Sequence, residues 1–207
     1  MKNAFIRRAG PQDLPYLYEI CLKTGDEGKD ATALFYDPYL IGQYFAAPYL
    51  FYPAGICFVV ENGSRPQGYL VAAPDSVLFS QWMEESWLPP LRERYPKPFR
   101  PEITRSPKEK WILESVHKPH FPGPVSRQGL VKDYPAELHI DLLPCIQGKG
   151  WGRALMERLD EELARLGVKG VRLGVGIENQ GAIAFYRKTG FSVLLEEKWG
   201  YIMGKTK

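Results

Sequence analysis

The chain has 207 residues, 44% of them hydrophobic and 25% charged, a composition that excludes a disordered protein. Its 27 basic and 24 acidic residues leave a net charge of only +3 and form no run of Lys and Arg, so we expect no nucleic-acid partner. The uncharged stretch 38–60 is interrupted by prolines and glycines, which argues against a membrane-spanning helix, and the N-terminus does not resemble a signal peptide. These features predict a single cytoplasmic domain over residues 1–207.

The first third of the chain is predicted to form a strand, two helices and a β-hairpin. Residues 4–8 read as a short strand, and Pro11 opens a helix that runs to about Lys23. A second helix is expected over residues 33–45. The apolar run 56–60 and the run 68–72 flank a turn rich in Asn, Gly and Pro, which predicts the hairpin.

Residues 75–134 differ from the rest because they are rich in Pro and Trp. Short helices are expected near 81–95 and 106–115. Because so many aromatic side chains need packing partners, we interpret this segment as an insertion that caps the core rather than as a linker.

The last third has a sharper pattern. Leu138, Ile140 and Leu142 alternate with polar residues, which predicts a two-faced strand, and a glycine-rich turn over residues 147–152 follows it. A helix is expected over 151–166, a strand over 171–175, a helix over 179–189, and strands over 191–195 and 199–203. This order predicts an α/β (α+β) fold in which helices flank a sheet.

The glycine-rich turn carries the chemistry. Glycines 148, 150 and 152 let the backbone turn tightly and approach a ligand, while the next helix directs its positive N-terminal end at the same place. Lys149 and Arg153 add positive charge, so the turn suits a phosphate or diphosphate. A P-loop would need Ser or Thr where Arg153 stands, and a dinucleotide-binding turn would need other glycine spacing.

Two motifs together resemble the GNAT acetyltransferase signature. The first is Gln147, Gly150 and Gly152 directly after a strand, and the second is the segment NQGAIAFYRKTGF, which begins at Asn179 and contains Tyr186. The resemblance implies a mixed central sheet of about six to seven strands, with the insertion between strands 3 and 4. It also implies that residues 136–191 form an acetyl-CoA-binding core.

A narrower resemblance concerns three segments, FVVENGSRPQGYLVAAPDSVLF, WLPPLRERYPKP and YPAELHIDLLP. They look like the acetyltransferase-like C-terminal domain of eukaryotic O-GlcNAcases and its bacterial relatives. The animal domain has lost the glycine-rich turn that this chain keeps, so the resemblance favours cofactor binding here.

The resemblance also implies roles for individual residues. The strand before the turn would pair with the amides of pantetheine, the turn would hold the diphosphate, and Tyr186 would protonate the leaving thiolate as a general acid. Asn179 matches a cofactor-contacting Asn, although it also suits a helix N-cap. The expected cofactor-binding residues are Ile140, Asp141, Leu142, Gln147, Gly148, Lys149, Gly150, Trp151, Gly152, Arg153, Asn179 and Tyr186.

The general base is less clear, because Gly174 stands where some GNAT enzymes have a Glu. Asp141, His139 and Glu137 remain as candidates on the polar face of the strand, and a chain of water molecules is an alternative. Asp141 is favoured because it lies closest to the expected position of the acetyl group.

The acceptor is expected between the first two helices and the later strands, where Asp26 and Asp30 could hold a cationic amine beside His139. We therefore expect an N-acetyltransferase that moves an acetyl group from acetyl-CoA directly to a primary amine of a small molecule or peptide. The alternative is a catalytically weak or inactive acyl-CoA-binding or protein-interaction module. No metal and no membrane partner are expected, and the last two strands could support a homodimer.

Overall fold

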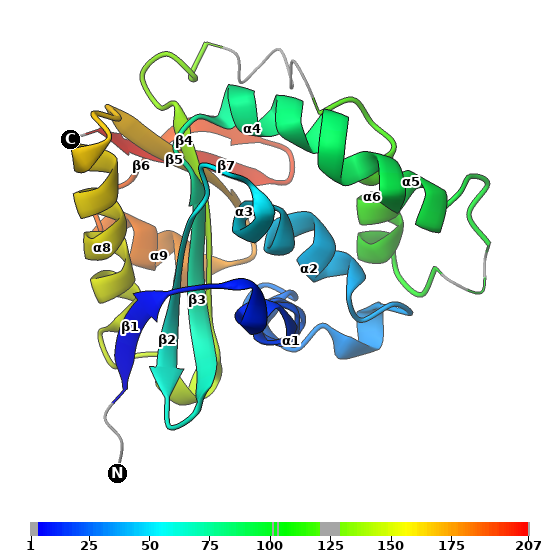
Figure 1. Cartoon of the computed structure of the whole chain (residues 1–207), viewed down its shortest axis with the longest axis horizontal. Helices are drawn as coiled ribbons and strands as arrows, with labels where there is room; N and C mark the ends of the chain where they lie inside the picture. The colour runs from blue at the N-terminus through cyan, green and yellow to red at the C-terminus, as the bar shows by residue number, and fades with distance from the viewer. Residues whose placement is uncertain (1–3, 101, 103, 121–128, 207) are drawn as a thin grey trace.

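A computed structural model of the chain describes residues 4–100, 102, 104–120 and 129–206. Its helices surround a seven-stranded sheet in the order β1-β2-β3-β4-β5-β7-β6 (Figure 1). Neighbouring strands are antiparallel except β4 and β5, which run parallel, so the sheet is mixed as expected. The strands are β1 (Phe5–Arg8), β2 (Ile56–Asn62), β3 (Arg65–Ala73), β4 (Ala136–Leu142), β5 (Gly170–Gly176), β6 (Ser192–Glu197) and β7 (Gly200–Thr206).

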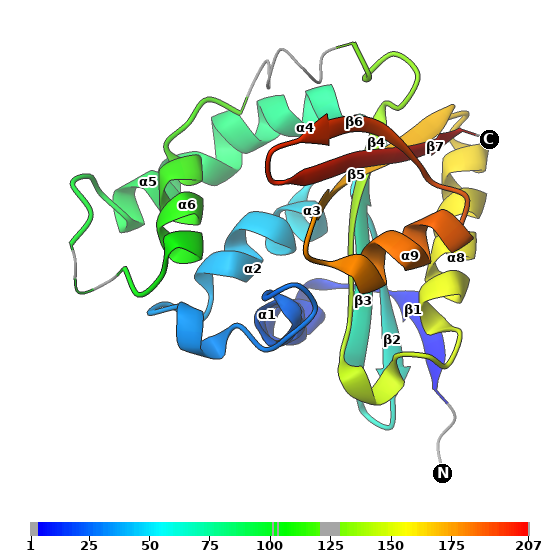
Figure 2. The ribbon, with the colours of Figure 1, turned by 180° about the vertical axis from the view of Figure 1, so that it is seen from behind.

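Helices cover both faces of the sheet, as Figures 1 and 2 show from opposite sides. Helices α1, α2 and α3 lie on one face, and α8 and α9 lie on the other. Because both faces are buried, the middle of β2 is apolar throughout: Val59 packs into the cluster beneath α1, and Val60 packs into the cluster beneath α8. The helices are α1 (Leu14–Thr24), α2 (Leu40–Phe45), α3 (Ala47–Phe51), α8 (Trp151–Arg165) and α9 (Gln180–Lys188).

The prediction of a helix over residues 33–45 is wrong for the first half of that range. The chain forms a 3-10 turn, η2 (Thr32–Leu34), and α2 begins only at Leu40. Glu109 accepts a hydrogen bond from the amide of Tyr36 at 2.7 Å, and Pro38 has no amide to donate, so the helical hydrogen bonds cannot continue through this segment. Helix α3 then forms where the sequence predicted a loop.

The insertion folds against the same face as α1 and α2. Its helices are α4 (Ser76–Trp82), the π-helical turn η3 (Met83–Trp87), α5 (Leu88–Arg94) and α6 (Pro107–Val116), so the first helical segment begins earlier than predicted. Phe79, Leu88 and Ile112 are buried in the cluster beneath α1, which makes the insertion part of the core. Residues 101, 103 and 121–128 of the predicted insertion lie outside the described part of the chain.

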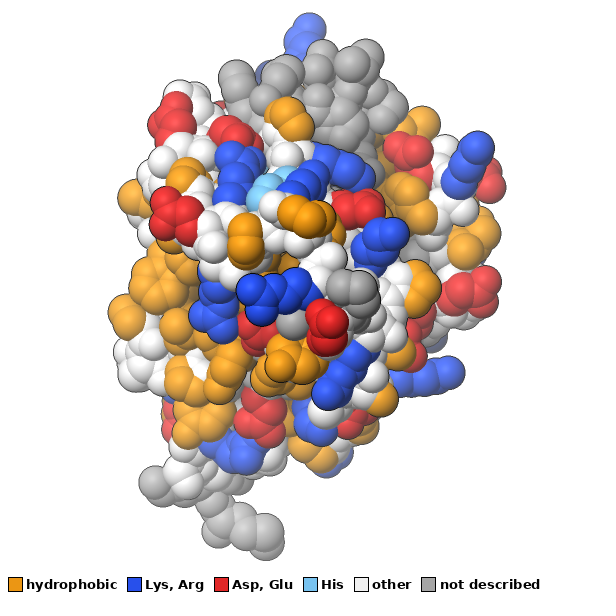
Figure 3. Space-filling view, turned by 90° about the vertical axis from the view of Figure 1, so that its right-hand side faces the viewer, with side chains coloured by type: hydrophobic (Ala, Val, Ile, Leu, Met, Phe, Trp, Pro, Cys, Tyr) orange, Lys and Arg blue, Asp and Glu red, His pale blue; other side chains and the backbone are white. Residues whose placement is uncertain are grey.

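The outer face of the molecule on the side of α5 and α6 is mixed in character. Figure 3 shows basic side chains interspersed with acidic and apolar ones. The uncharged stretch 38–60 is taken up by α2, α3 and the start of β2. No helix in the described ranges is long and apolar enough to cross a membrane.

Candidate functional site

The sheet opens between β4 and β5. Their parallel register contains only two pairs, Ala136 with Val171 and Glu137 with Arg172. On its other side β4 stays paired with β3 as far as Leu142. The edge of β4 that faces β5 therefore has no strand partner in the described register beyond Glu137. Backbone groups alternate between the two edges of a strand, and the amide of Leu143 donates to Gln67 of β3, so the main chains of Ile140 and Leu142 face this edge whereas that of Asp141 faces β3. Of the three residues predicted to pair with pantetheine, Ile140 and Leu142 are thus placed to do so through the main chain.

The glycine-rich turn forms an open backbone cradle at the end of β4. Gly148 and Gly150 adopt left-handed φ angles of 69° and 84°, and a Cβ atom at either position would meet nothing within 4 Å. Gly150 precedes α8, whose first intrahelical bond runs from the amide of Ala154 to the carbonyl of Gly150. The amides of residues 151–153 consequently have no acceptor within the helix, as the anion site requires.

The polar side chains of the turn contact protein atoms instead of facing the cradle. Gln147 Nε2 donates to the carbonyl of Leu142 at 2.7 Å, and Lys149 Nζ donates to the carbonyl of Cys145 at 2.8 Å. Arg153 Nε donates to Glu157 at 3.0 Å on the surface of α8. In this arrangement the main chain, rather than the predicted basic side chains, supplies most of the cradle.

Two of the predicted residues have structural roles at helices α8 and α9. Gly152 is buried, and a Cβ atom there would lie only 3.1 Å from the ring of Phe185, so glycine permits the close packing of the two helices. Asn179 caps α9, because its Oδ1 accepts a hydrogen bond from the amide of Ala182 at 3.1 Å. The N-cap role expected as one reading of Asn179 is therefore present. Trp151 is half-buried against the cluster beneath α8.

A polar cluster lies beside the opening on the face that carries α1. The buried Tyr69 of β3 donates to Asp141 Oδ2 at 2.6 Å, and its hydroxyl lies 3.0 Å from His139 Nδ1. Burial raises the pKa of Asp141, although His139, Tyr69 and Thr24 act in the opposite direction. The Asp141 side chain nevertheless keeps 17% of its surface exposed. A carboxylate with a raised pKa at a reachable position is suited to accept a proton.

Tyr69 is a site residue that sequence reasoning missed. Its position in an apolar run gave no indication of a polar role. The register gives the reason for its contact, since Tyr69 pairs directly with Asp141 across β3 and β4 and their side chains share one face.

Tyr186 projects from α9 and is only 8% exposed. Burial, followed by the negative charge of Asp141, raises the pKa of its phenol well above the ordinary value. The phenol therefore remains protonated at neutral pH. It can donate a proton to a strongly basic group but cannot act as a base.

Glu137 is placed differently from the other base candidates. Its Oε1 accepts a hydrogen bond from the Tyr49 hydroxyl at 2.9 Å, and its Oε2 lies 3.8 Å from Arg172 Nη2. Arg172 is buried and also donates to Ser76 Oγ at 2.8 Å. Glu137 thus belongs to a structural network at the point where β4 and β5 separate.

The two carboxylates predicted to hold the acceptor, in the loop after α1, contact different lysines. Asp30 Oδ2 accepts from Lys23 at 2.8 Å, and Lys23 followed by Thr32 lowers the pKa of Asp30 to about 2. Asp26 Oδ1 instead accepts from Lys108 of α6 at 3.1 Å. The structure therefore brings Asp26, but not the carboxylate of Asp30, into contact with the insertion.

Aromatic rings link the insertion to His139. The Phe45 ring of α2 stacks on His139 with centroids 5.4 Å apart, and on its other side stacks on Trp111 of α6 at 6.2 Å. His139 therefore lies at the inner end of an aromatic wall.

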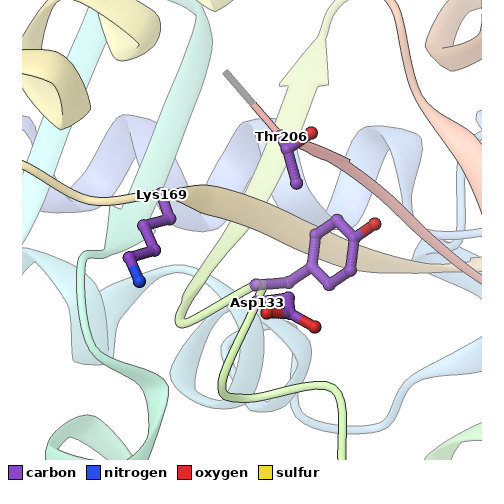
Figure 4. Close-up of a pocket in the computed structure, with 4 residues that line it drawn as sticks. Asp133, Lys169 and Thr206 are labelled. Atoms are coloured by element: carbon purple, nitrogen blue, oxygen red, sulfur yellow. The ribbon is translucent and has the colours of Figure 1, made fainter.

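A hollow elsewhere on the surface is a poor alternative site. It has a volume of about 480 Å³ and is lined by Asp133, Tyr134, Lys169 and Thr206. Figure 4 shows that its labelled side chains do not converge on one point. It lies next to the start of β5, whereas the cluster around Asp141 lies near the level of the other end of that strand. Among the described residues no group of three or more potential metal ligands was found.

The fold and this opening define the class of protein. Its mixed sheet separates between two parallel strands, and the separation lies beside a backbone cradle suited to an anion. The sequence profile of the Acetyltransferase (GNAT) family matches residues 26–191, and the chain belongs to this family.

Individual relatives agree with that assignment. The chain is 26% identical to rat protein O-GlcNAcase over 185 residues, which cover 89% of the chain but only 20% of the relative, so the chain spans about a fifth of that protein's length. A crystal structure of SsHAT matches with a TM-score of 0.86 and 33% identity, covering 99% of this chain and 98% of the other. The acetyltransferase YncA of Salmonella typhimurium, solved with acetyl-CoA, matches with a TM-score of 0.55 and 18% identity over 99% and 94% of the two chains.

Proposed function

We propose that the protein is an N-acetyltransferase that binds acetyl-CoA in the opening between β4 and β5 and transfers its acetyl group to a primary amine. The observation that carries this proposal is the combination of an unpaired β4 edge with an amide cradle at its end. A peptide-like linker and a diphosphate are the two parts of coenzyme A that need such partners. Family membership supports the same reaction class.

The residues present fit this ligand. The space in front of Gly148 and Gly150 is open, so a diphosphate could approach the amides of residues 148–153 without meeting a side chain at these glycines. Ile140 and Leu142 would contribute main-chain groups to pantetheine, because the main chain of Asp141 is directed at β3. Bound acetyl-CoA supplies an acyl carbon that is activated as a thioester.

Side chains of the protein would then carry out the proton transfers. Asp141 accepts a proton from the acceptor ammonium, which leaves a neutral amine that can form the new C–N bond. As the C–S bond breaks, the Tyr186 phenol would donate its proton to the sulfur and recover one from the product nitrogen, which still carries a surplus proton after the C–N bond forms. The net transfer is therefore from a protonated amide nitrogen to a thiolate whose thiol has an ordinary pKa near ~8.5, and the raised pKa of Tyr186 keeps the phenol protonated between turnovers. Tyr69 orients Asp141 through the 2.6 Å hydrogen bond.

A direct test combines ligand binding with turnover. Acetyl-CoA should raise the melting temperature, and incubation with a panel of primary amines should release free thiol from acetyl-CoA. A clear thermal shift without thiol release for any amine would instead support the non-catalytic acyl-CoA-binding module. The absence of any thermal shift would refute the proposed site.

A further inference from the structure

On its β5 side the opening has glycines in place of side chains of the strand itself, and the ring of Trp199 lies over the first of them, 2.8 Å from where a Cβ atom of Gly174 would stand. Extending the register of Glu137 with Arg172 places residue 139 level with Gly174 and residue 141 level with Gly176. Because side chains alternate along a strand, both glycines belong to the face that carries His139 and Asp141. The sheet itself therefore provides a carboxylate on the β4 side of the opening and none on the β5 side.

A carboxylate from another element occupies this surface. A Cβ atom at Gly176 would lie 2.7 Å from Glu27 Oε2 and 3.1 Å from Glu27 Oε1, so the carboxylate of Glu27 rests directly on the β5 backbone. Glu27 belongs to the loop after α1. It is thus placed over β5 at the level where Asp141 stands on β4.

A tight turn places Glu27. The backbones of Asp26 and Lys29 exchange two hydrogen bonds of 2.9 Å, which makes residues 27 and 28 a two-residue turn. Such a turn requires a left-handed conformation at both positions, and the φ angle of Glu27 is accordingly 51°, which is unfavourable for a residue with a side chain. Gly28, the next residue, also has a positive φ of 85°.

The insertion fixes the same loop. Lys108 of α6 donates to the carbonyl of Gly25 at 2.9 Å and to Asp26 Oδ1 at 3.1 Å, and its Nζ lies 3.7 Å from Glu27 Oε1. Asp26 and Glu27 carry the two negative charges that meet Lys108, while Lys29 on the far side of the same turn adds one positive charge. The Glu27 side chain remains 37% exposed, so an approaching cation can still reach it.

We propose that Glu27 is an acceptor-binding residue that holds the incoming ammonium opposite Asp141, and that the preferred acceptor is a short aliphatic amine that carries no carboxylate. This inference rests on the proposed acetyltransferase function and adds the substrate class. Glu27 attracts and positions the cation, whereas Asp141 removes its proton. An acceptor that carries its own carboxylate is disfavoured because that group would lie near the carboxylates of Glu27 and Asp141.

The test compares three probes of similar chain length: butylamine, putrescine and γ-aminobutyrate. The wild-type protein should have a lower KM for butylamine and for putrescine than for γ-aminobutyrate. Glu27→Gln should raise the KM for butylamine about five- to tenfold with little change in kcat, because binding in the ground state and the transition state is lost equally. Glu161→Gln, on the exposed surface of α8, is the matched control and should leave both constants unchanged.

Two further variants separate this role from a structural one. Glu27→Gly should keep or raise the melting temperature, because it relieves the left-handed strain, while it raises the KM as Glu27→Gln does. Glu27→Lys should reverse the preference between butylamine and γ-aminobutyrate.

The two levels of failure are distinguishable. Equal KM values for wild type and Glu27→Gln, with turnover intact, would overturn this inference and leave the proposed function standing. No thiol release from the wild type with any of the three probes would count against the proposed function itself, and the role of Glu27 would fall with it.

Discussion

Replacing Gly150 by Ala tests the amide cradle, and Gly167 provides an internal control. Both glycines flank α8, with left-handed φ angles of 84° and 68°, and neither has an atom within 4 Å of an added Cβ. Each substitution should therefore cost about 1–2 kcal/mol of stability through backbone strain alone. For a chain of this length, that loss lowers the melting temperature by roughly 2–8 °C.

The two variants should differ in their response to acetyl-CoA. At a concentration about 100 times its Kd, a ligand stabilises the folded protein by about 2.7 kcal/mol, or roughly 5–10 °C here. In Gly150→Ala the new methyl group occupies the open space of the cradle, or the backbone relaxes and turns its amides away. A tenfold weaker affinity would remove about 1.4 kcal/mol, which is half of that thermal shift.

Differential scanning fluorimetry with increasing acetyl-CoA measures both effects on one instrument. We expect Gly167→Ala to retain the full ligand-induced shift and Gly150→Ala to lose about half of it or more. If both variants show the same shift as the wild type, the turn before α8 does not hold the diphosphate.

Four other variants test the proton-transfer groups. Tyr186→Phe should keep the acetyl-CoA thermal shift but lower kcat about 100-fold, because a general acid contributes on this order; unchanged kcat in a steady-state thiol assay would exclude that role. Asp141→Asn should lower kcat and abolish the acidic limb of the pH–rate profile, while Glu137→Gln should leave that limb in place. Burial raises the pKa of Asp141 in the folded state, so the contribution of this carboxyl to the free energy of unfolding is complete at low pH and is lost as the pH rises through the folded pKa. Asp141→Asn should therefore raise the melting temperature at neutral pH. Tyr69→Phe removes a hydrogen bond that lowers the pKa of Asp141, so the acidic limb should move to higher pH, and a shift to lower pH would contradict the contact.

The features predicted well from the sequence are those determined locally. The strand from Leu138 to Leu142 has clear alternation, and the glycines of the turn must accommodate positive φ angles, so both could be recognised without knowing the fold. The Asn179 cap and the helix after it are likewise encoded within a few residues. The family and the mixed seven-stranded sheet follow from these motifs and are confirmed.

The features that were missed depend on contacts between distant segments. The late start of the helix predicted over 33–45 depends partly on Glu109, which belongs to α6 of the insertion. Tyr69 became a site residue only through its register with Asp141. The sequence singled out Asp26 and Asp30 but not Glu27, because the place of Glu27 on Gly176 requires the fold of the loop and the sheet together.

The same reasoning explains why Asp30 looked equivalent to Asp26. Both are carboxylates in one polar loop, and the sequence does not show which cation each will meet. The structure separates them, because Lys23 of α1 binds Asp30 whereas Lys108 of the insertion binds Asp26.

Nitrogen-15 NMR of the backbone amides tests the site most directly, by comparing acetyl-CoA with S-acetylpantetheine, which lacks the diphosphate. We predict that acetyl-CoA shifts the amide signals of Gly148 and Gly150 strongly, that S-acetylpantetheine leaves them nearly unchanged, and that both ligands shift the signals of Ile140 and Leu142. Unmoved glycine signals in the presence of saturating acetyl-CoA would contradict the account.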